Sequence, residues 1–141
     1  TEARFREIEI RTHYDDDLPR ITTDQAQLQQ VFLNIIDNAI DAVGKAGYID
    51  ITTSRDPRSG KEVYIQVTDS GPGMPKETMA RIFDPFFTTK KANEGTGLGL
   101  SISYGIVKDH GGELSMESEP GKLTRFHMDL PVDNGWSIEK S

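Results

Sequence analysis

The chain has 141 residues, with 16 Lys and Arg against 23 Asp and Glu, a net charge of −7 and no cysteine. This length suits one domain, and the acidic balance argues against a nucleic-acid partner because a phosphate backbone would be repelled. The absence of cysteine excludes thiol chemistry and cysteine zinc sites, and it is compatible with the cytoplasm, where we expect the chain to work. Without an apolar run of roughly 18 residues, no membrane contact is expected. A chain that opens on Thr1 and not on Met reads as a piece of a longer protein.

The first third of the chain changes from a period of two to a helical period. Apolar and charged residues alternate over residues 7–11, which predicts a half-buried strand. Apolar residues then recur at three- and four-residue steps over about 24–44, which predicts one amphipathic helix. Its expected boundaries are Thr23 or Asp24 as the N-cap and Gly44 or Gly47 after the last turn.

The remaining elements alternate between short strands and helices. We expect strands at 49–53 and 63–67 joined by a turn at 56–60, a short helix at about 76–82, a second long helix at about 100–110, and a hairpin of 113–118 with 124–130. This order predicts an α/β fold, a two-layer sandwich with a mixed β-sheet and helices on one face. The domain is expected to cover residues 1–132, and residues 133–141 form a polar tail.

Three polar residues share one face of the predicted helix. Asn34, Asn38 and Asp41 stand at i, i+4 and i+7, beside the apolar stripe. Mg²⁺ prefers oxygen ligands and commonly takes only one or two from the protein beside substrate phosphates, so the carboxamide of Asn38 suits it. The alternative is a solvated helix face.

An acidic residue and two glycines follow the strand at 63–67. The carboxylate of Asp69 can accept a hydrogen bond from the exocyclic amino group of adenine, whereas it would repel the carbonyl of guanine. Gly71 and Gly73 allow a sharp turn and a close approach of the backbone to the base. The alternative is that this pentapeptide is merely a turn.

A segment rich in phenylalanine precedes a polar stretch without periodicity. Phe83, Phe86 and Phe87 surround Pro85, and the stretch 88–94 is expected to be a mobile lid. Phe83 and Phe87 are assigned to the nucleotide site, and Phe86 is expected to be a core anchor. Lys90 and Lys91 would bring positive charge to the β- and γ-phosphates, unless they are simply solvated.

A second glycine turn opens the second long helix. It consists of Gly95, Thr96, Gly97, Leu98 and Gly99. It is neither a Rossmann fingerprint, since no strand precedes it, nor a Walker loop, since no Gly-Lys-Ser/Thr ends it. Its free backbone amides can meet phosphate oxygens at the positive end of the helix dipole.

Together the four segments resemble the nucleotide-binding domain of bacterial sensor histidine kinases, in the superfamily shared with gyrase, the Hsp90 chaperones and the mismatch-repair ATPases. The resemblance implies the Bergerat-type fold and binding of ATP with Mg²⁺. It places the metal on Asn38 with Asn34 beside it, and it makes Asn34, Asn38 and Lys90 the catalytic residues. It also brings Thr124 near the adenine pocket. Asp41 stands where a Lys or Arg is often found, so its phosphate contact is left open.

The residue at position 34 distinguishes two activities within that superfamily. In the gyrase-like ATPases the position of Asn34 holds a glutamate that activates water, and an amide cannot act as such a base. The sequence therefore favours transfer of the γ-phosphoryl group to a histidine. The expected partners are a histidine-bearing dimerisation domain of the same parent kinase and, indirectly, a response regulator. His13, His110 and His127 are interpreted as structural. The alternatives are a gyrase- or Hsp90-like ATPase, or a regulatory nucleotide-binding module without catalysis.

Overall fold

The computed structural model describes residues 7–56, 58, 61–85 and 99–132. Its elements follow the predicted order. In sequence they are β1 (Glu7–His13), α1 (Gln25–Val43), β2 (Ala46–Arg55), β3 (Glu62–Asp69), α2 (Lys76–Met79), α3 (Gly99–Asp109), β4 (Glu113–Glu119) and β5 (Leu123–Pro131).

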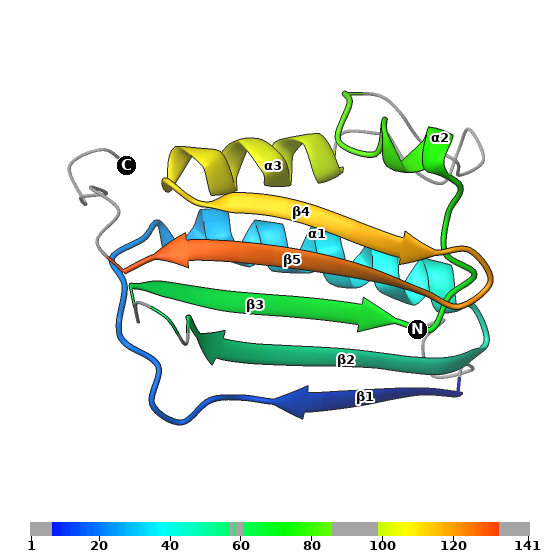
Figure 1. The fold of residues 1–141 in the computed structure, drawn as a ribbon, viewed down its shortest axis with the longest axis horizontal. Helices are drawn as coiled ribbons and strands as arrows, with labels where there is room; N and C mark the ends of the chain where they lie inside the picture. Colours follow the sequence, from blue (N-terminus) through cyan, green and yellow to red (C-terminus); the bar gives the residue numbers. More distant parts are fainter. Residues whose placement is uncertain (1–6, 57, 59–60, 86–98, 133–141) are drawn as a thin grey trace.

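The described strands form one mixed sheet in the order β1-β2-β3-β5-β4. β1 and β2 are parallel, because α1 connects them and returns the chain to the same end of the sheet. The pairs β2–β3, β3–β5 and β4–β5 are antiparallel. Figure 1 shows α1 and α3 lying side by side behind this sheet, and α2 standing near the turn between β4 and β5.

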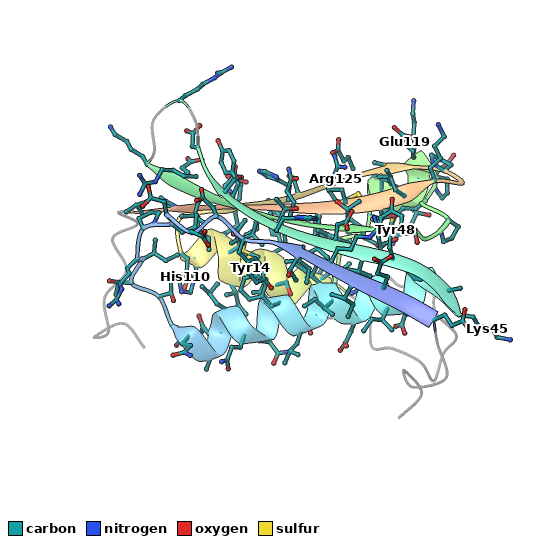
Figure 2. All side chains as sticks on the ribbon, turned by 90° about the horizontal axis from the view of Figure 1, so that it is seen from below. Tyr14, Lys45, Tyr48, His110, Glu119 and Arg125 are labelled. Atoms are coloured by element: carbon teal, nitrogen blue, oxygen red, sulfur yellow. The ribbon has the colours of Figure 1, made fainter. Side chains whose placement is uncertain are left out.

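The core lies between the sheet and the two long helices. Alternate residues of β3 and β5, such as Val67 and Phe126, point toward Val31 and Ile35 of α1. The opposite face of the sheet carries polar side chains, and Figure 2 shows Arg125 and Glu119 on that face while His110 lies on the helical side. The predicted two-layer α/β sandwich with helices on one face is confirmed.

The ends of α1 follow the predicted capping chemistry. The side chain of Asp24 accepts a hydrogen bond from the amide of Gln27 (3.1 Å), and Gly44 takes a positive φ of 77° at the other end. The main-chain N–H of Asp24 in turn donates to Nε2 of His110 (3.1 Å). The ring of His110 is fully buried, and its Nδ1 donates to the carbonyl of Ile106 (2.9 Å). His110 therefore joins the end of α3 to the start of α1, in the structural role that was predicted.

The largest differences from the predicted boundaries are in α2 and β2. The short helix, predicted to run to residue 82, ends at Met79. Beyond it the chain continues in tight turns, in which the amide of Arg81 donates to the carbonyl of Thr78 and the amide of Asp84 donates to the carbonyl of Arg81. Strand β2 is longer than predicted. Its main-chain pairing with β1 and β3 extends beyond residues 49–53, where the side chains alternate in the sequence.

Candidate functional site

A cavity of about 340 Å³ opens where the end of β3 meets the C-terminal half of α1 and the start of α3. One part of its wall is polar and the other is apolar. The polar lining residues are Asn38, Asp41, Asp69, Thr78 and Thr124, and the others are Ala42, Pro72, Gly73, Met74, Pro75, Ile82, Leu100 and Phe126. A polar end beside an apolar wall is typical of a small-molecule site.

Asp69 is the buried acidic group of this cavity. It ends β3, its exposed fraction is 2%, and its Oδ1 accepts a 2.8 Å hydrogen bond from the amide of Gly71. Burial raises the pKa of Asp69 to about 6, against the opposing effect of the Gly71 hydrogen bond. A buried carboxylate with one hydrogen bond retains acceptor capacity for a donor in the cavity.

Thr124 lies directly opposite Asp69. The two residues are register partners in the antiparallel pair β3–β5, and Thr124 is 3% exposed. Opposed residues in such a pair have neighbouring side chains on the same face of the sheet. The predicted adenine-reading carboxylate and the predicted late threonine are thus brought together in one wall.

The glycines of the first glycine turn are required by contacts within the protein. A Cβ on Gly71 would lie 2.8 Å from Oδ1 of Asp69 and 2.9 Å from the carbonyl of Ala42. Gly73 has a φ of 70°, and a Cβ there would lie 2.3 Å from the carbonyl of Glu119. From the sequence, Gly71 and Gly73 were expected to allow a close approach of the backbone to the base. In the structure the close neighbours of these glycines are α1, the side chain of Asp69 and the end of β4.

Asn38 and Asn34 have different environments although both lie on α1. The amide nitrogen of Asn38 donates to the carbonyl of Asn34 (2.8 Å), so the Oδ1 of Asn38 is left as an acceptor at the cavity. The amide nitrogen of Asn34 donates to the carbonyl of Gly99 and to the hydroxyl of Ser103, each at 3.0 Å. Its Oδ1 accepts from Gln30 (3.0 Å), and Asn34 does not line the cavity. Asn34 therefore joins α1 to the first turn of α3 in this structure.

The other predicted residues have four different placements. Asp41 is exposed and lines the cavity. Phe83 packs its ring against Tyr104 and Phe126, at centroid distances of 5.2 and 6.3 Å, and so supports the cavity wall from behind. Gly99 begins α3. Phe87, Lys90, Gly95, Thr96, Gly97 and Leu98 lie outside the described residues.

The sequence did not reveal the apolar wall. Met74, Pro75, Ile82, Leu100 and Phe126 contribute to it from four different parts of the chain. One local signal was present, because Met74 and Pro75 directly follow Gly73, the last residue of the predicted glycine turn. The rest required knowledge of which elements meet.

The donor set fits an adenine nucleotide with a magnesium ion. The apolar wall suits a flat base, and Asp69 offers an acceptor for its amino group. The Oδ1 of Asn38 and the carboxylate of Asp41 are oxygen ligands of the kind that Mg²⁺ takes in small number beside phosphates and water. Within the described ranges, there is no group of three or more His, Cys, Asp or Glu that would hold a metal ion by itself.

This fold, with a buried carboxylate opposite a threonine at the mouth of the sheet, defines a nucleotide-binding domain of the ATPase class. The family model described as histidine kinase-, DNA gyrase B- and HSP90-like ATPase matches residues 23–134. The chain belongs to this family.

Its relatives within the family are sensor kinases. Sensor histidine kinase ZraS of Escherichia coli K12 is 46% identical over 132 residues, which are 94% of this chain and 27% of that protein. Sporulation kinase A of Bacillus subtilis 168 is 40% identical over 131 residues, covering 93% of this chain and 21% of that protein. The chain therefore spans about a quarter of the length of these curated relatives.

Solved structures of histidine kinases have the same fold. The nucleotide-free catalytic domain of histidine kinase ThkA matches with a TM-score of 0.79 at 36% identity, covering 93% of this chain and 83% of that chain. Full-length ShkA in complex with AMPPNP matches with a TM-score of 0.77 at 32% identity, covering 92% of this chain and 27% of that chain. No helix in the described part of the chain is both long and apolar enough to span a membrane.

Proposed function

We propose that this domain binds ATP with Mg²⁺ in the cavity at the end of β3 and donates the γ-phosphoryl group to a histidine on another domain of a sensor kinase. The observation that carries the proposal is the placement of Asp69, Thr124 and Asn38 around one cavity in a family of ATPases. The curated relatives, which are named as sensor histidine kinases and sporulation kinases, favour histidine as the acceptor.

Different residues of the cavity bind different parts of the nucleotide and its metal ion. Asp69 accepts a hydrogen bond from the adenine amino group, and the apolar wall from Met74 to Phe126 contacts the base. Asn38 presents its Oδ1 from the middle of α1, where it is held by the bond to Asn34. When bound, magnesium neutralises charge on the phosphates, as phosphoryl transfer generally requires. Catalysis then rests on holding the phosphates in position for the acceptor.

The position of Asn34 argues against a hydrolytic clamp. A water-activating base must reach the water that attacks the γ-phosphate. Asn34 has an amide in place of a basic group, and both its nitrogen and its oxygen are used in contacts with α3 and Gln30. The gyrase- and Hsp90-like alternative is therefore disfavoured within the same family.

The proposed partner is the histidine-bearing dimerisation domain of the parent kinase. A structure of ThkA in complex with the response regulator TrrA matches this chain with a TM-score of 0.77, which is consistent with a response regulator as the eventual recipient. The site of action that follows from this proposal is the cytoplasm.

The buried histidine of the domain itself, His110, is bonded at both ring nitrogens and is unsuited to accept phosphate.

The test uses γ-labelled ATP with the chain alone and then with the separately purified dimerisation domain of the parent kinase, a helical hairpin that bears the acceptor histidine. The chain alone should bind ATP and consume it slowly, because general-base assistance is commonly worth about 10²–10⁴-fold. An acid-labile label should appear on the hairpin, weakly, since the covalent link that raises effective concentration is absent. Rapid phosphate release by the chain alone would instead favour the clamp ATPase. Binding without label on the hairpin would favour a regulatory module.

A further inference from the structure

Ser118, near the end of β4, contacts two residues of the cavity wall, Met74 and Thr124, although it does not itself line the cavity. Its Oγ accepts a hydrogen bond from the amide of Met74 (2.8 Å). The same hydroxyl donates to the carbonyl of Leu123 (2.9 Å) and lies 3.2 Å from Oγ1 of Thr124. Ser118 and Thr124 are register partners, as Thr124 and Asp69 are, so the three side chains form one row across β4, β5 and β3.

The hydrogen bonds of Ser118 determine where the hydroxyl proton of Thr124 lies. A carbonyl only accepts, so the single proton of Ser118 is committed to Leu123. An amide N–H only donates, so Met74 occupies one lone pair of Ser118. By geometry either hydroxyl could donate in the contact between Ser118 and Thr124, and Thr124 is the donor when the Ser118 proton is used for Leu123. Ser118 thereby makes the three hydrogen bonds that a serine hydroxyl can make.

The consequence for the cavity is a wall of acceptors. Because the proton of Thr124 points toward Ser118, the lone pairs of Thr124 and the ionised carboxylate of Asp69 can both accept hydrogen bonds from donors on whatever binds beside them. A 6-amino purine supplies donors at this edge, either directly or through a bridging water. A 6-oxo purine has its donor at N1 and carries an acceptor at position 6, where its oxo group would face these two acceptors.

We propose that Ser118 is a positioning residue for base selection. By holding the Thr124 hydroxyl as an acceptor beside Asp69, it increases the preference of the cavity for a 6-amino over a 6-oxo purine nucleotide. The proposal rests on the proposed function, since it requires the base to lie against Asp69 and Thr124.

The glycine turn is attached to the same hairpin, which gives the row a fixed position. The amide of Gly121 donates to the carbonyl of Pro72 (2.5 Å), and Met74 is bonded to Ser118. The turn that lines the cavity at Pro72, Gly73 and Met74 is thus held against the end of β4 from two sides. A purely structural role for Ser118 would act through these contacts and would affect every nucleotide alike.

The experiment measures the dissociation constants of ATP and inosine triphosphate, which carries an oxo group at position 6, by calorimetry on the whole chain. The dissociation constant of inosine triphosphate divided by that of ATP should fall about tenfold in Ser118→Ala, because the freed Thr124 hydroxyl can rotate and donate to the oxo group. Ser118→Thr, which keeps the hydroxyl, should retain the wild-type ratio. Ser115→Ala is the control, since Ser115 is an exposed serine on the same strand. Adding Ser118→Ala to Thr124→Val should change the ratio no further.

An unchanged ratio in Ser118→Ala, with both nucleotides weakened equally, would overturn the inference and leave ATP binding intact. Failure of the wild-type chain to bind ATP would overturn the proposed function and this inference with it. If Ser118→Ala does not fold, Ser118→Cys serves in its place, since a thiol has similar shape and hydrogen-bonds weakly. Its ratio should then lie between those expected for serine and alanine, and a wild-type ratio would count against the role.

Discussion

The side-chain amide of Asn38 donates a 2.8 Å hydrogen bond to the carbonyl of Asn34, one turn earlier in α1. This bond fixes which end of the carboxamide faces the cavity, because a carbonyl can only accept. The oxygen of Asn38 therefore faces the cavity as an acceptor, which is the orientation that a metal ligand needs. The local geometry of a single helix thus prepares the proposed magnesium site.

Replacing Asn38 with Ala should weaken ATP binding in the presence of Mg²⁺ and leave the fold intact. The ion loses a protein oxygen, whereas alanine is favourable in a helix. Calorimetric titration of ATP with and without Mg²⁺ measures the effect, and the loss should be confined to the titration with the metal. Gln29→Ala removes a neutral amide from the exposed side of α1 and should bind like wild type. Equal affinity of Asn38→Ala and wild type in Mg²⁺ would exclude Asn38 as the metal ligand.

Binding of ATP should depend on pH through Asp69. Only the ionised carboxylate is purely an acceptor, and burial raises its pKa to about 6. Affinity should therefore be about tenfold weaker at about pH 5 than at about pH 7. Asp69→Asn should bind ATP more weakly by about 1–3 kcal/mol at neutral pH, because an amide donor can face the adenine amino group. It should also lose the part of the pH dependence that comes from Asp69. A pH profile that is the same in both proteins would show that Asp69 does not contact the base.

The same carboxylate should lower the stability of the folded chain as the pH rises, whereas it increases the affinity for ATP. Its pKa rises from a model-peptide value of 3.8 to about 6 on folding. Between these values the folded chain binds more protons than the unfolded chain, so the contribution of Asp69 to stability falls as the pH rises from about 4 to about 6. Urea unfolding across this range should show a downward component in wild type that is absent from Asp69→Asn.

His110 should contribute to stability through its two hydrogen bonds. His110→Leu fills the buried site with an apolar side chain but leaves the main-chain N–H of Asp24 and the carbonyl of Ile106 without their hydrogen-bond partner on the ring. We expect a loss of about 1–3 kcal/mol in the free energy of unfolding. His13→Leu, at the exposed end of β1, is the matched control and should change stability little. Comparable stabilities for the two variants would contradict the role of His110 as a link between α1 and α3.

The sequence could predict those features that residues close together in the chain determine, and not those that depend on residues far apart in the chain. The start of α1 at Asp24 and its end at Gly44 are set by neighbouring residues, and both were recognisable. The strands of the last hairpin were recognisable for the same reason. By contrast, a side chain at Gly71 would collide with Ala42 on another element. The hydrogen bonds of Asn34 are with residues 65 and 69 positions later. The row from Asp69 to Ser118 exists only because β5 inserts between β3 and β4.

The hydrogen bonds of Asn34 predict that a glutamate at this position would not by itself turn the domain into an ATPase. A glutamate at this position is the feature expected of the hydrolytic relatives. Here the amide of Asn34 donates to the carbonyl of Gly99 and to Ser103, whose own hydroxyl donates to the same carbonyl (2.9 Å). A carboxylate has no N–H to donate, and it would face the carbonyl oxygen. The hydrogen bonds of Asn34 to the first turn of α3 would therefore be lost before any base was gained.

We accordingly expect Asn34→Asp and Asn34→Glu to reduce the free energy of unfolding by about 1–3 kcal/mol, without increasing ATP hydrolysis. Gln29→Glu adds the same charge on the exposed side of α1 and should be close to wild type in stability. Urea unfolding and phosphate release on the same preparations measure both quantities. A stable Asn34→Glu protein with faster phosphate release would show that residue 34 can reach the attacking water. In that event the position would belong to the catalytic site, and the amide of Asn34, not its contacts with α3, would be what separates this domain from the clamp ATPases.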